Sequence, residues 1–534
     1  MKTKVLDQLD GVLTRARRQT LGDLLTRTRE RYPDKFAIAY RDQRLTYQEL
    51  DDLVNQTAHA FRRDGVQKGD MITVMSKNSL DFVVVNFALA RLGAVMIPIN
   101  YMLTEDDVAY ILNHAGVTGF IAPEEFAPIL EKSKGNLEIK FRYLMEFPNN
   151  QRVSEVLQDW KPLSHLQAGQ PTDLVDEDLD DDDLAHVLYT SGTESRPKGV
   201  MLTHKSIVSE YVSCVVNGEM SDKDVCIHAL PLYHSAQLHC FLGPSIYLGS
   251  SGIILDAASP EVILETIERE QITQLFCPPT VWIALLRHPD FDSRDLSTLE
   301  KCYYGAAIMP REILKELSER LPQARFYNFY GQTEVAPLAT ALGPDEQLTK
   351  LGSAGKPTLN MQTRIVDDND VEVARGEVGE IVHRTPHAMK GYLHDPKKTA
   401  EAFKNGWFHS GDLGVMDEDG YITIVDRKKD MIKTGGVNVS SREVEEMIYQ
   451  LEGVSEVAVI GIPDNYWIEA VTAIVVPKLE TNLTEQQVID FCQDKLSKFK
   501  VPKHVAFTDE LPKNPSGKVL KRDLREQFND LNQK

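Results

Sequence analysis

Short apolar runs alternate with amphipathic stretches through the first four hundred residues of the chain. The runs 71–76, 94–99 and 252–255 predict buried strands, because strands covered on both faces carry consecutive apolar side chains. The stretches 80–92 and 260–270 predict helices that connect such strands. This alternation predicts layered α/β structure with largely parallel sheets.

The pattern changes after about residue 360. Acidic turn clusters at 367–370 and 417–420 flank residues of high β-propensity, notably 421–425, and this predicts hairpins. The charged run 426–430 then interrupts the strand pattern. Beyond it the sequence predicts a helix, two strands and a second helix, at 441–451, 457–461, 470–477 and 485–496.

These patterns divide the chain into two predicted domains. We expect a large N-terminal domain at 1–428, built of layered α/β subdomains with a β-rich subdomain, and a small α+β domain at 429–534. The second domain is about a hundred residues long, a normal size for an independent unit. A chain of 534 residues is also too long for a single core.

Composition and charge exclude several classes of protein. With 42% hydrophobic and 26% charged residues, the chain has the composition of a soluble globular protein. The formal net charge of −21 opposes nucleic-acid binding. No targeting signal is visible at the N-terminus, and the apolar segment 82–99 contains Asn86 and Arg91, so we expect no transmembrane segment. Peripheral membrane contact and a homodimer are left open.

The cysteines are scattered along the chain without a C-x-x-C pair. There are six, at positions 214, 226, 240, 277, 302 and 492. This spacing argues against a zinc site or a disulfide framework and indicates a reducing, cytoplasmic compartment.

The most informative segment is a turn rich in glycine and hydroxyl residues. It follows the apolar run 184–189, leads into a helix-like segment after Met201, and contains Thr190, Ser191, Gly192, Thr193 and Lys198. Glycine lets backbone N–H groups approach a phosphate, hydroxyls donate hydrogen bonds, and the lysine supplies a compact positive charge. Because Pro197 and Gly199 flank the lysine, the segment is not a Walker P-loop.

Four later segments complete a pattern that resembles the adenylate-forming superfamily of acyl-CoA synthetases, luciferases and peptide-synthetase adenylation domains. They are Tyr330-Gly331-Gln332-Thr333-Glu334, Gly406-Trp407-Phe408-His409-Ser410-Gly411-Asp412, Asp426-Arg427-Lys428-Lys429-Asp430 followed by Gly435-Gly436, and Asn514-Pro515-Ser516-Gly517-Lys518. Order and spacing agree with the family over nearly the whole chain. The resemblance implies an AMP-forming acid–thiol ligase that uses ATP, Mg²⁺ and CoA.

The resemblance also implies a role for each residue at the nucleotide. Thr190 to Thr193 and Lys198 would hold the β- and γ-phosphates, Thr333 would contact phosphate, and Glu334 would be the metal ligand for Mg²⁺. The adenine would lie against Tyr330 and Gly331, beside the small residues Gly305, Ala306 and Ala307, and the ribose would bind Asp412 and Arg427. Lys518 would bridge the substrate carboxylate and the α-phosphate during adenylation.

A second step would transfer the acyl group from AMP to a thiol. In the family the small, mobile C-terminal domain rotates about a residue that corresponds to Lys429. The rotation brings a glycine loop, here Gly435 and Gly436, against the pantetheine channel, and Lys433 is assigned to the same CoA-binding set. Glycines suit a wall along which a narrow chain must slide.

The residues expected to contact the acid are largely apolar. They lie at 231–238 and continue to Phe241. By resemblance His234 is placed near the acyl carboxyl as a catalytic candidate, whereas His239 is interpreted as structural. The apolar character favours a medium- or long-chain fatty acid. Aromatic acids, and a carrier-protein phosphopantetheine arm in place of CoA, remain alternatives.

Two departures from the family pattern stand out. The phosphate turn has Glu194-Ser195 where the family has Thr-Gly, and Trp467-Ile468-Glu469 stands where the family often has Trp-Gly-Glu. Two further alternatives are a P-loop phosphotransferase or ATPase and a non-catalytic acyl or nucleotide sensor. The first conflicts with Pro197 and Gly199, and the second with the presence of Lys518, Glu334 and Asp412.

Overall fold

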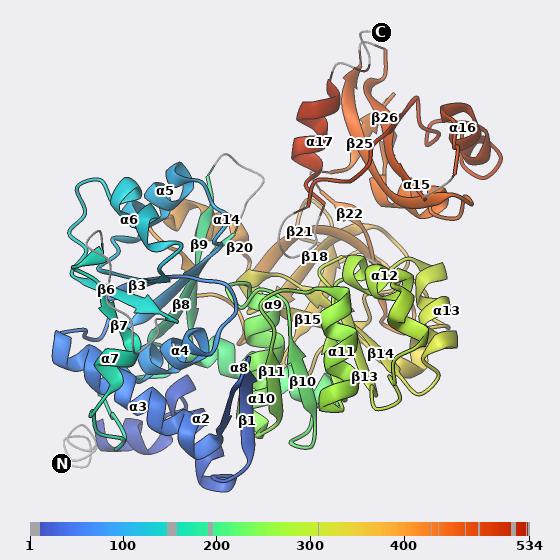
Figure 1. Ribbon diagram of the computed structural model, residues 1–534. Coiled ribbons are helices and arrows are strands. Elements are labelled where there is room, and N and C mark those ends of the chain that lie inside the picture. Colours follow the sequence, from blue (N-terminus) through green and yellow to red (C-terminus); the bar gives the residue numbers. More distant parts are fainter. Residues whose placement is uncertain are drawn as a thin grey trace.

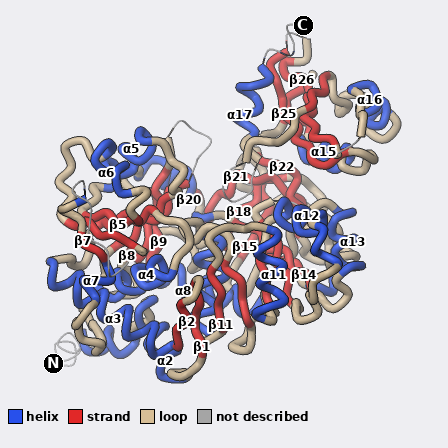
Figure 2. Tube along the Cα trace, in the orientation of Figure 1, coloured by secondary structure: helices blue, strands red, loops and turns tan. Residues whose placement is uncertain are grey.

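The computed structural model describes residues 11–146, 157–190, 196–307, 309–428, 430–435, 437–464, 466–478, 481–513, 519–529 and 531. These residues form four β-sheets with helices packed around them (Figures 1 and 2). The mixed α/β fold class expected from the sequence is confirmed.

Two large sheets form the N-terminal part. In the described residues one runs in the order β16 (Lys356–Pro357), β15 (Leu338–Leu342), β14 (Arg325–Gly331), β13 (Lys301–Gly305), β12 (Gln274–Phe276), β10 (Val225–His228), β11 (Ser251–Ile254), β1 (Phe36–Tyr40) and β2 (Gln43–Thr46). The other runs β19 (Gly391–Tyr392), β9 (Lys198–Thr203), β8 (Leu184–Thr190), β4 (Val95–Ile99), β3 (Met71–Met75), β5 (Gly119–Pro123), β6 (Phe141–Met145) and β7 (Lys161–Pro162). In both, the central pairs are parallel and antiparallel pairs lie toward an edge.

Helices α4 (Leu80–Leu92) and α8 (His204–Asn217) share one core with strands of both sheets. Helix α4 begins where Ser79 accepts a hydrogen bond from the Phe82 N–H, and it ends at Gly93 with φ +68°. Nearly every residue between these caps is buried, since other elements cover the helix all round. The remaining helices of this part are α2 (Leu21–Arg31), α3 (Tyr47–Asp64), α5 (Glu105–Ala115), α6 (Ala127–Ser133), α7 (Leu163–Gln167), α9 (Ser235–Gln237), α10 (Gly243–Leu248), α11 (Pro260–Glu270), α12 (Pro279–Arg287), α13 (Arg311–Arg320) and α14 (Pro396–Ala402).

A smaller antiparallel sheet follows in the chain. It contains β17 (Gln362–Val366), β18 (Gly379–Arg384), β21 (Trp407–Met416), β20 (Phe403–Lys404) and β22 (Ile422–Arg427). This is the β-rich part that the turn clusters predicted.

The C-terminal sheet builds its own core. Its strands are β24 (Val437–Val439), β23 (Ile432–Thr434), β26 (Ile468–Pro477), β25 (Val454–Asp464) and β27 (His504–Phe507), and its helices are α15 (Ser441–Ile448), α16 (Glu485–Gln493) and α17 (Lys521–Phe528). Along β26 successive side chains alternate between two clusters. Val471, Ala473 and Val475 pack on one face and Ala470 and Ile474 on the other, as the two-residue period of a strand requires.

Hydrogen bonds join the start of α15 to the end of β22. Asp426 accepts from the Ser441 N–H at 2.7 Å and from its hydroxyl at 2.8 Å. Arg442 donates to the carbonyl oxygen of Ile424 and, at 3.0 Å, to that of Gly352. In Figure 1 the C-terminal sheet therefore stands above β21 and β22, attached at this corner.

Two strands differ from the expectation. The helix expected after Met201 is present as α8, which begins at His204, but residues 198–203 before it form the strand β9, which pairs antiparallel with β8. The charged residues Asp426 and Arg427 do not end the strand pattern but belong to β22, where Arg427 pairs with Asp412 of β21. In both cases pairing with a neighbouring strand overrides the local sequence signal.

Candidate active site

A cavity of about 2560 Å³ between the N-terminal part and the C-terminal sheet gathers most of the predicted residues. Those that line it are Thr190, Lys198, His234, Ala306, Ala307, Tyr330, Gly331, Thr333, Glu334, Asp412 and Arg427. Of the described candidates, Gly305, Lys433 and Gly435 do not line it. The predicted residues Ser191, Gly192, Thr193, Lys429, Gly436 and Lys518 lie outside the described residues.

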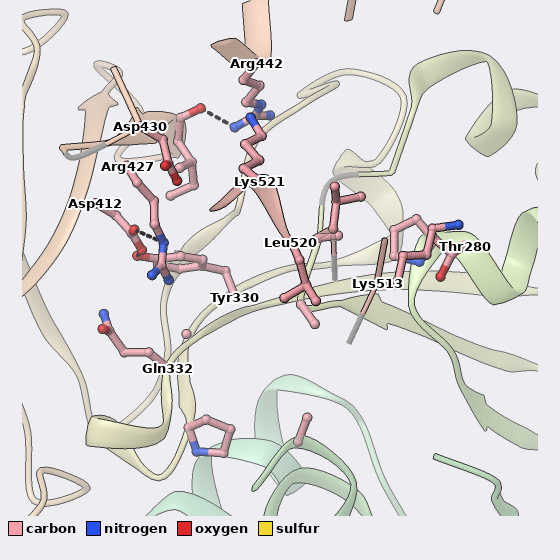
Figure 3. A pocket seen from close by; sticks show the side chains of 18 of the residues that line it. Thr280, Tyr330, Gln332, Asp412, Arg427, Asp430, Arg442, Lys513, Leu520 and Lys521 are labelled. Atoms are coloured by element: carbon pink, nitrogen blue, oxygen red, sulfur yellow. Dashed lines mark hydrogen bonds and ion pairs between the residues drawn. The ribbon is translucent and has the colours of Figure 1, made fainter. Parts of the chain in front are cut away.

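A tyrosine, a carboxylate and a guanidinium meet at one end of the cavity (Figure 3). The Tyr330 hydroxyl donates to Asp412 Oδ2 at 2.6 Å, and Arg427 Nε lies 3.0 Å from Asp412 Oδ1. The Asp412 side chain is only 5% exposed, so its carboxylate is sheltered from water, whereas the Arg427 side chain is 37% exposed. The arrangement fixes an acceptor beside an aromatic ring.

The environment shifts the pKa of two of these groups. Burial raises the pKa of Tyr330 well above its usual value, and the Asp412 charge adds to the effect. Burial is the largest single influence on Arg427 and lowers its pKa, but the negative charge of Asp412 and of the other acidic groups nearby together outweighs it, so the pKa of Arg427 is raised. Tyr330 therefore remains a neutral donor and Arg427 a cation at neutral pH.

Thr333 and Glu334 lie on a short 3₁₀ turn, Thr333–Val335, after β14. The Tyr392 hydroxyl donates to Glu334 Oε1 at 2.9 Å, and Thr333 Oγ1 lies 3.2 Å from Ser235 Oγ. The carboxylate and the hydroxyl are thus held in place at the cavity wall. Both are hard oxygen groups, the kind that Mg²⁺ prefers.

Lys198 is the first residue of β9 and pairs with Thr190, the last residue of β8. Its ammonium is 4.5 Å from the centre of the Tyr392 ring, a cation–π distance. Tyr392 thus links the lysine to Glu334. Tyr392 belongs to none of the predicted motifs, and its only signal in the sequence is a Gly-Tyr pair, which folds as a two-residue strand against β9.

Two glycines of the predicted adenine side are required by close backbone contacts. A Cβ on Gly331 would overlap the carbonyl oxygen of Pro337, and a Cβ on Gly305 would overlap that of Phe329. Gly305 thus lets β13 approach β14 closely, and the following Ala306 and Ala307 line the cavity. The small side chains leave room there for a flat ligand.

The predicted acid-binding side is apolar. His234 caps the short helix α9, its Nδ1 accepting from the Ala236 N–H at 3.3 Å. Cys240 and Phe241 follow on a π-helical turn, Leu238–Leu242, and both line the cavity. The Phe241 ring stacks on Phe276 with the ring centres 4.2 Å apart. His239 is fully buried and 2.8 Å from His186, in agreement with its structural interpretation.

The C-terminal sheet supplies another wall of the same cavity. Residues on both sides of the predicted Lys518 turn, Lys513 before it and Leu520 and Lys521 after it, line the cavity with Tyr330 and Asp412 (Figure 3). Lys521 also forms an ion pair with Glu445 at 2.8 Å.

The glycine turn predicted for CoA lies away from this cavity. Gly435 has φ +56° and its N–H donates to the Trp467 carbonyl oxygen at 2.7 Å. The Lys433 N–H donates to Glu469 at 2.6 Å. Ile468 lies between these partners with φ +72°, the left-handed conformation that suits the glycine of the family pattern.

Comparison with known families agrees with the geometry. Residues 25–393 match the AMP-binding enzyme family and residues 443–518 match its C-terminal domain. The chain belongs to the AMP-binding enzyme family. This confirms the resemblance to the adenylate-forming superfamily and that the protein is an enzyme.

The relatives of this AMP-binding enzyme act on different acids. A feruloyl-CoA synthase from Amycolatopsis sp is 34% identical over 96% of this chain and 100% of its own length. A long-chain-fatty-acid–CoA ligase from Escherichia coli O157:H7 is 32% identical over 96% of this chain and 95% of its own. The crystal structure of ATP-bound MatB from Rhodopseudomonas palustris superposes with a TM-score of 0.87, with 30% identity over 96% of this chain and 99% of that one.

Among the described residues of this AMP-binding enzyme, every helix is too short or too polar to cross a bilayer.

Proposed function

We propose that this enzyme is an ATP-dependent fatty-acid–CoA ligase that activates a medium- or long-chain acid as acyl-AMP and transfers the acyl group to the thiol of CoA. The observation that carries the proposal is a single cavity with a polar end at Tyr330, Asp412 and Arg427 and an apolar wall at Cys240 and Phe241. One end suits a nucleoside and the other an alkyl chain.

The first step needs little acid–base chemistry. A carboxylate is already ionised at neutral pH, so one of its oxygens attacks the α-phosphorus and pyrophosphate leaves with the electrons of the broken P–O bond. The barrier lies in bringing two anions together, and positioned cations lower it. We assign Lys198 to the β- and γ-phosphates, Thr333 to a phosphate oxygen and Lys518 to the space between carboxylate and α-phosphate. His234 is assigned to the acyl carboxyl.

Mg²⁺ fits the donors at Glu334. This carboxylate would hold the ion, with the Thr333 hydroxyl beside it and Tyr392 fixing its orientation. The bound ion would supply positive charge at the phosphates.

The second step requires a different position of the C-terminal part. We place the domain boundary between residues 428 and 429 and assign Lys433, Gly435 and Gly436 to CoA. Lys433 and Gly435 do not line the cavity in this arrangement. This supports a mechanism in which Lys518 acts in adenylation and the glycine turn acts in thiolation. The six buried cysteines, which form no disulfide, support a reducing, cytoplasmic location.

An aromatic acid is the second candidate substrate. It is supported by the feruloyl-CoA synthase relative and by the aromatic wall of Phe241 and Phe276. A flat ring could stack on this wall.

Pyrophosphate release measured over saturated acids of graded length, benzoate and ferulate, with and without CoA, tests the proposal. We expect the highest kcat/KM for an aliphatic acid and thioester formation only with CoA. A clear preference for ferulate would move the assignment to aromatic acids. Thioester formation on a carrier protein but not on CoA would replace the acceptor.

Two variants separate the half-reactions. Lys518→Ala should abolish acyl-AMP formation but retain thioester formation from supplied acyl-AMP, whereas Gly436→Leu should do the reverse. Equal loss of both half-reactions in either variant would contradict the two-position mechanism.

A further inference from the structure

A carboxyl and two thiols, distant in the sequence, meet behind the acid-binding wall. Glu210 and Cys214 lie one helical turn apart on α8, and Cys240 comes from the π-helical turn Leu238–Leu242. Glu210 Oε1 accepts from Cys214 Sγ at 2.9 Å and from Cys240 Sγ at 3.2 Å. All three ligand atoms lie within 4.8 Å of one another and all three residues are buried.

We propose that Glu210, Cys214 and Cys240 bind a soft divalent cation, of which Zn²⁺ is the common example, and that the bound cation blocks the inner end of the acid-binding wall. A zinc site was not expected from the sequence, because the chain contains no C-x-x-C pair. Folding nevertheless brings together the thiols of Cys214 and Cys240, which are 26 residues apart in the chain.

The geometry of the cluster is close to that of a coordination site. Zn–S bonds of about 2.3 Å and Zn–O bonds of about 2.0 Å at tetrahedral angles separate a sulfur from an oxygen ligand by roughly 3.5 Å. The observed S···O distances of 2.9 and 3.2 Å therefore need only a small expansion. Thiolates select Zn²⁺ over Mg²⁺, so the magnesium required for ATP would not compete.

The net charge of a filled site would be small. Without a cation, the Cys214 and Cys240 thiols carry protons, which they donate to Glu210. On binding, the displaced protons pass to solvent. Two thiolates and a carboxylate around a divalent ion carry a net charge of about −1, which costs far less in the interior than isolated charges.

Cys240 connects the cluster to the active site. It lines the cavity next to Phe241, whereas Glu210 and Cys214 lie behind it. A cation would enter through the cavity and leave one coordination position toward it. The acid and the cation would then compete for the same wall, and this second part of the inference depends on the proposed function.

Titration of the reduced, metal-free, full-length enzyme with Co²⁺ tests the site without any substrate. Tetrahedral Co²⁺ bound by thiolates shows strong sulfur-to-metal absorbance. We expect one equivalent to bind the natural enzyme, and Zn²⁺ to displace it. Cys214→Ala, Cys240→Ser and the nearly isosteric Glu210→Gln should each weaken binding at least about tenfold.

The matched control is Cys492→Ala, a buried cysteine of the C-terminal core, which should bind Co²⁺ as the natural enzyme does. Circular dichroism of each variant identifies loss of folding, and Cys240→Ser preserves size where Cys214→Ala does not. Absence of thiolate absorbance in the natural enzyme, or full absorbance in folded Cys240→Ser, would overturn the site.

Inhibition by Zn²⁺ is measured in a separate assay. Zn²⁺ should raise the KM for the acid in the natural enzyme but not in Cys214→Ala. This variant is chosen because Cys214 does not line the cavity, so the substitution leaves the acid-binding wall itself unchanged. Binding of Co²⁺ with no change in KM would refute the blocking role. If no acid is activated at all, the proposed function falls, while the absorbance still decides the site.

Discussion

Ile468 has a backbone conformation that glycine adopts freely and that a β-branched residue adopts only at a cost. Its φ is +72°, its side chain is 63% exposed, and it pairs with Thr434 beside the Gly435 turn. An exposed isoleucine gains little from packing to offset this strain. We predict that Ile468→Gly is more stable than Ile468→Ala.

The magnitude follows from two opposing terms. Both variants lose the same side chain beyond Cβ, so packing losses largely cancel. The left-handed conformation costs a residue with a Cβ about 1–2 kcal/mol, and glycine costs about 0.5–1 kcal/mol in chain entropy. The glycine variant should therefore be more stable by about 0.5–1 kcal/mol, or roughly 2–5 °C in Tm for a cooperative unit of about 100 residues.

Val437 provides the matched control. It is exposed, lies on β24 of the same sheet, and its φ is not positive. There the order should reverse, with Val437→Gly less stable than Val437→Ala by about 0.5–1 kcal/mol.

The assay is differential scanning calorimetry of the full chain, with amide hydrogen exchange of peptides spanning 430–478 to assign the transition. If Ile468→Ala equals or exceeds Ile468→Gly in stability, the strain is absent and the reasoning is wrong.

Three other predictions concern the cavity and the core. Gly331→Ala would place its Cβ against the Pro337 carbonyl, so we expect a displaced Thr-Glu turn and at least a tenfold loss of kcat/KM for ATP. The control Gly343→Ala, at a φ of −73° with only the flexible end of the Glu346 side chain near the added Cβ, should leave the KM for ATP unchanged. Tyr330→Phe removes one hydrogen bond to Asp412 and should weaken ATP binding by about 1 kcal/mol, which is roughly a fivefold rise in the KM for ATP. Asp412→Asn should raise this KM further, because Arg427 loses its counter-charge. Burial lowers the pKa of His228 to about 3, below its unfolded value of about 6.5. The unfolded chain therefore binds the extra proton, and the free energy of unfolding must fall as the pH drops from about 6.5 toward 3. Urea unfolding should show a shallower fall with pH in His228→Gln, and an unchanged pH dependence would contradict the assignment.

Residues that cap or start helices determined how accurately the helix ends could be predicted from the sequence. Helices α4 and α11 agree with prediction at both ends, because Ser79 and Gly93 cap the first and Pro260 begins the second. Strand β9 was not predicted, because only its pairing with β8 identifies residues 198–203 as a strand. Such pairing depends on contacts outside any local window.

The residues of the candidate site could be predicted from the sequence, but the contacts among them could not. The motifs and their resemblance named Tyr330, Asp412 and Arg427, yet nothing in the sequence states that the hydroxyl and the guanidinium both reach one carboxylate. Tyr392 and the Glu210 cluster were missed because each lies in a segment without a motif. Their importance comes only from neighbours brought close by folding.

The breadth of the shared cavity has a consequence for product yield. A ligand pocket usually measures about 300–1,000 Å³, and this space is larger, with walls from both parts of the chain. An acyl-AMP formed there would be a mixed anhydride, which water can hydrolyse before a thiol reaches it. If the proposed two-position mechanism operates, the fraction of ATP lost to hydrolysis should depend on how fast the C-terminal part changes position, rather than on the shape of the N-terminal walls.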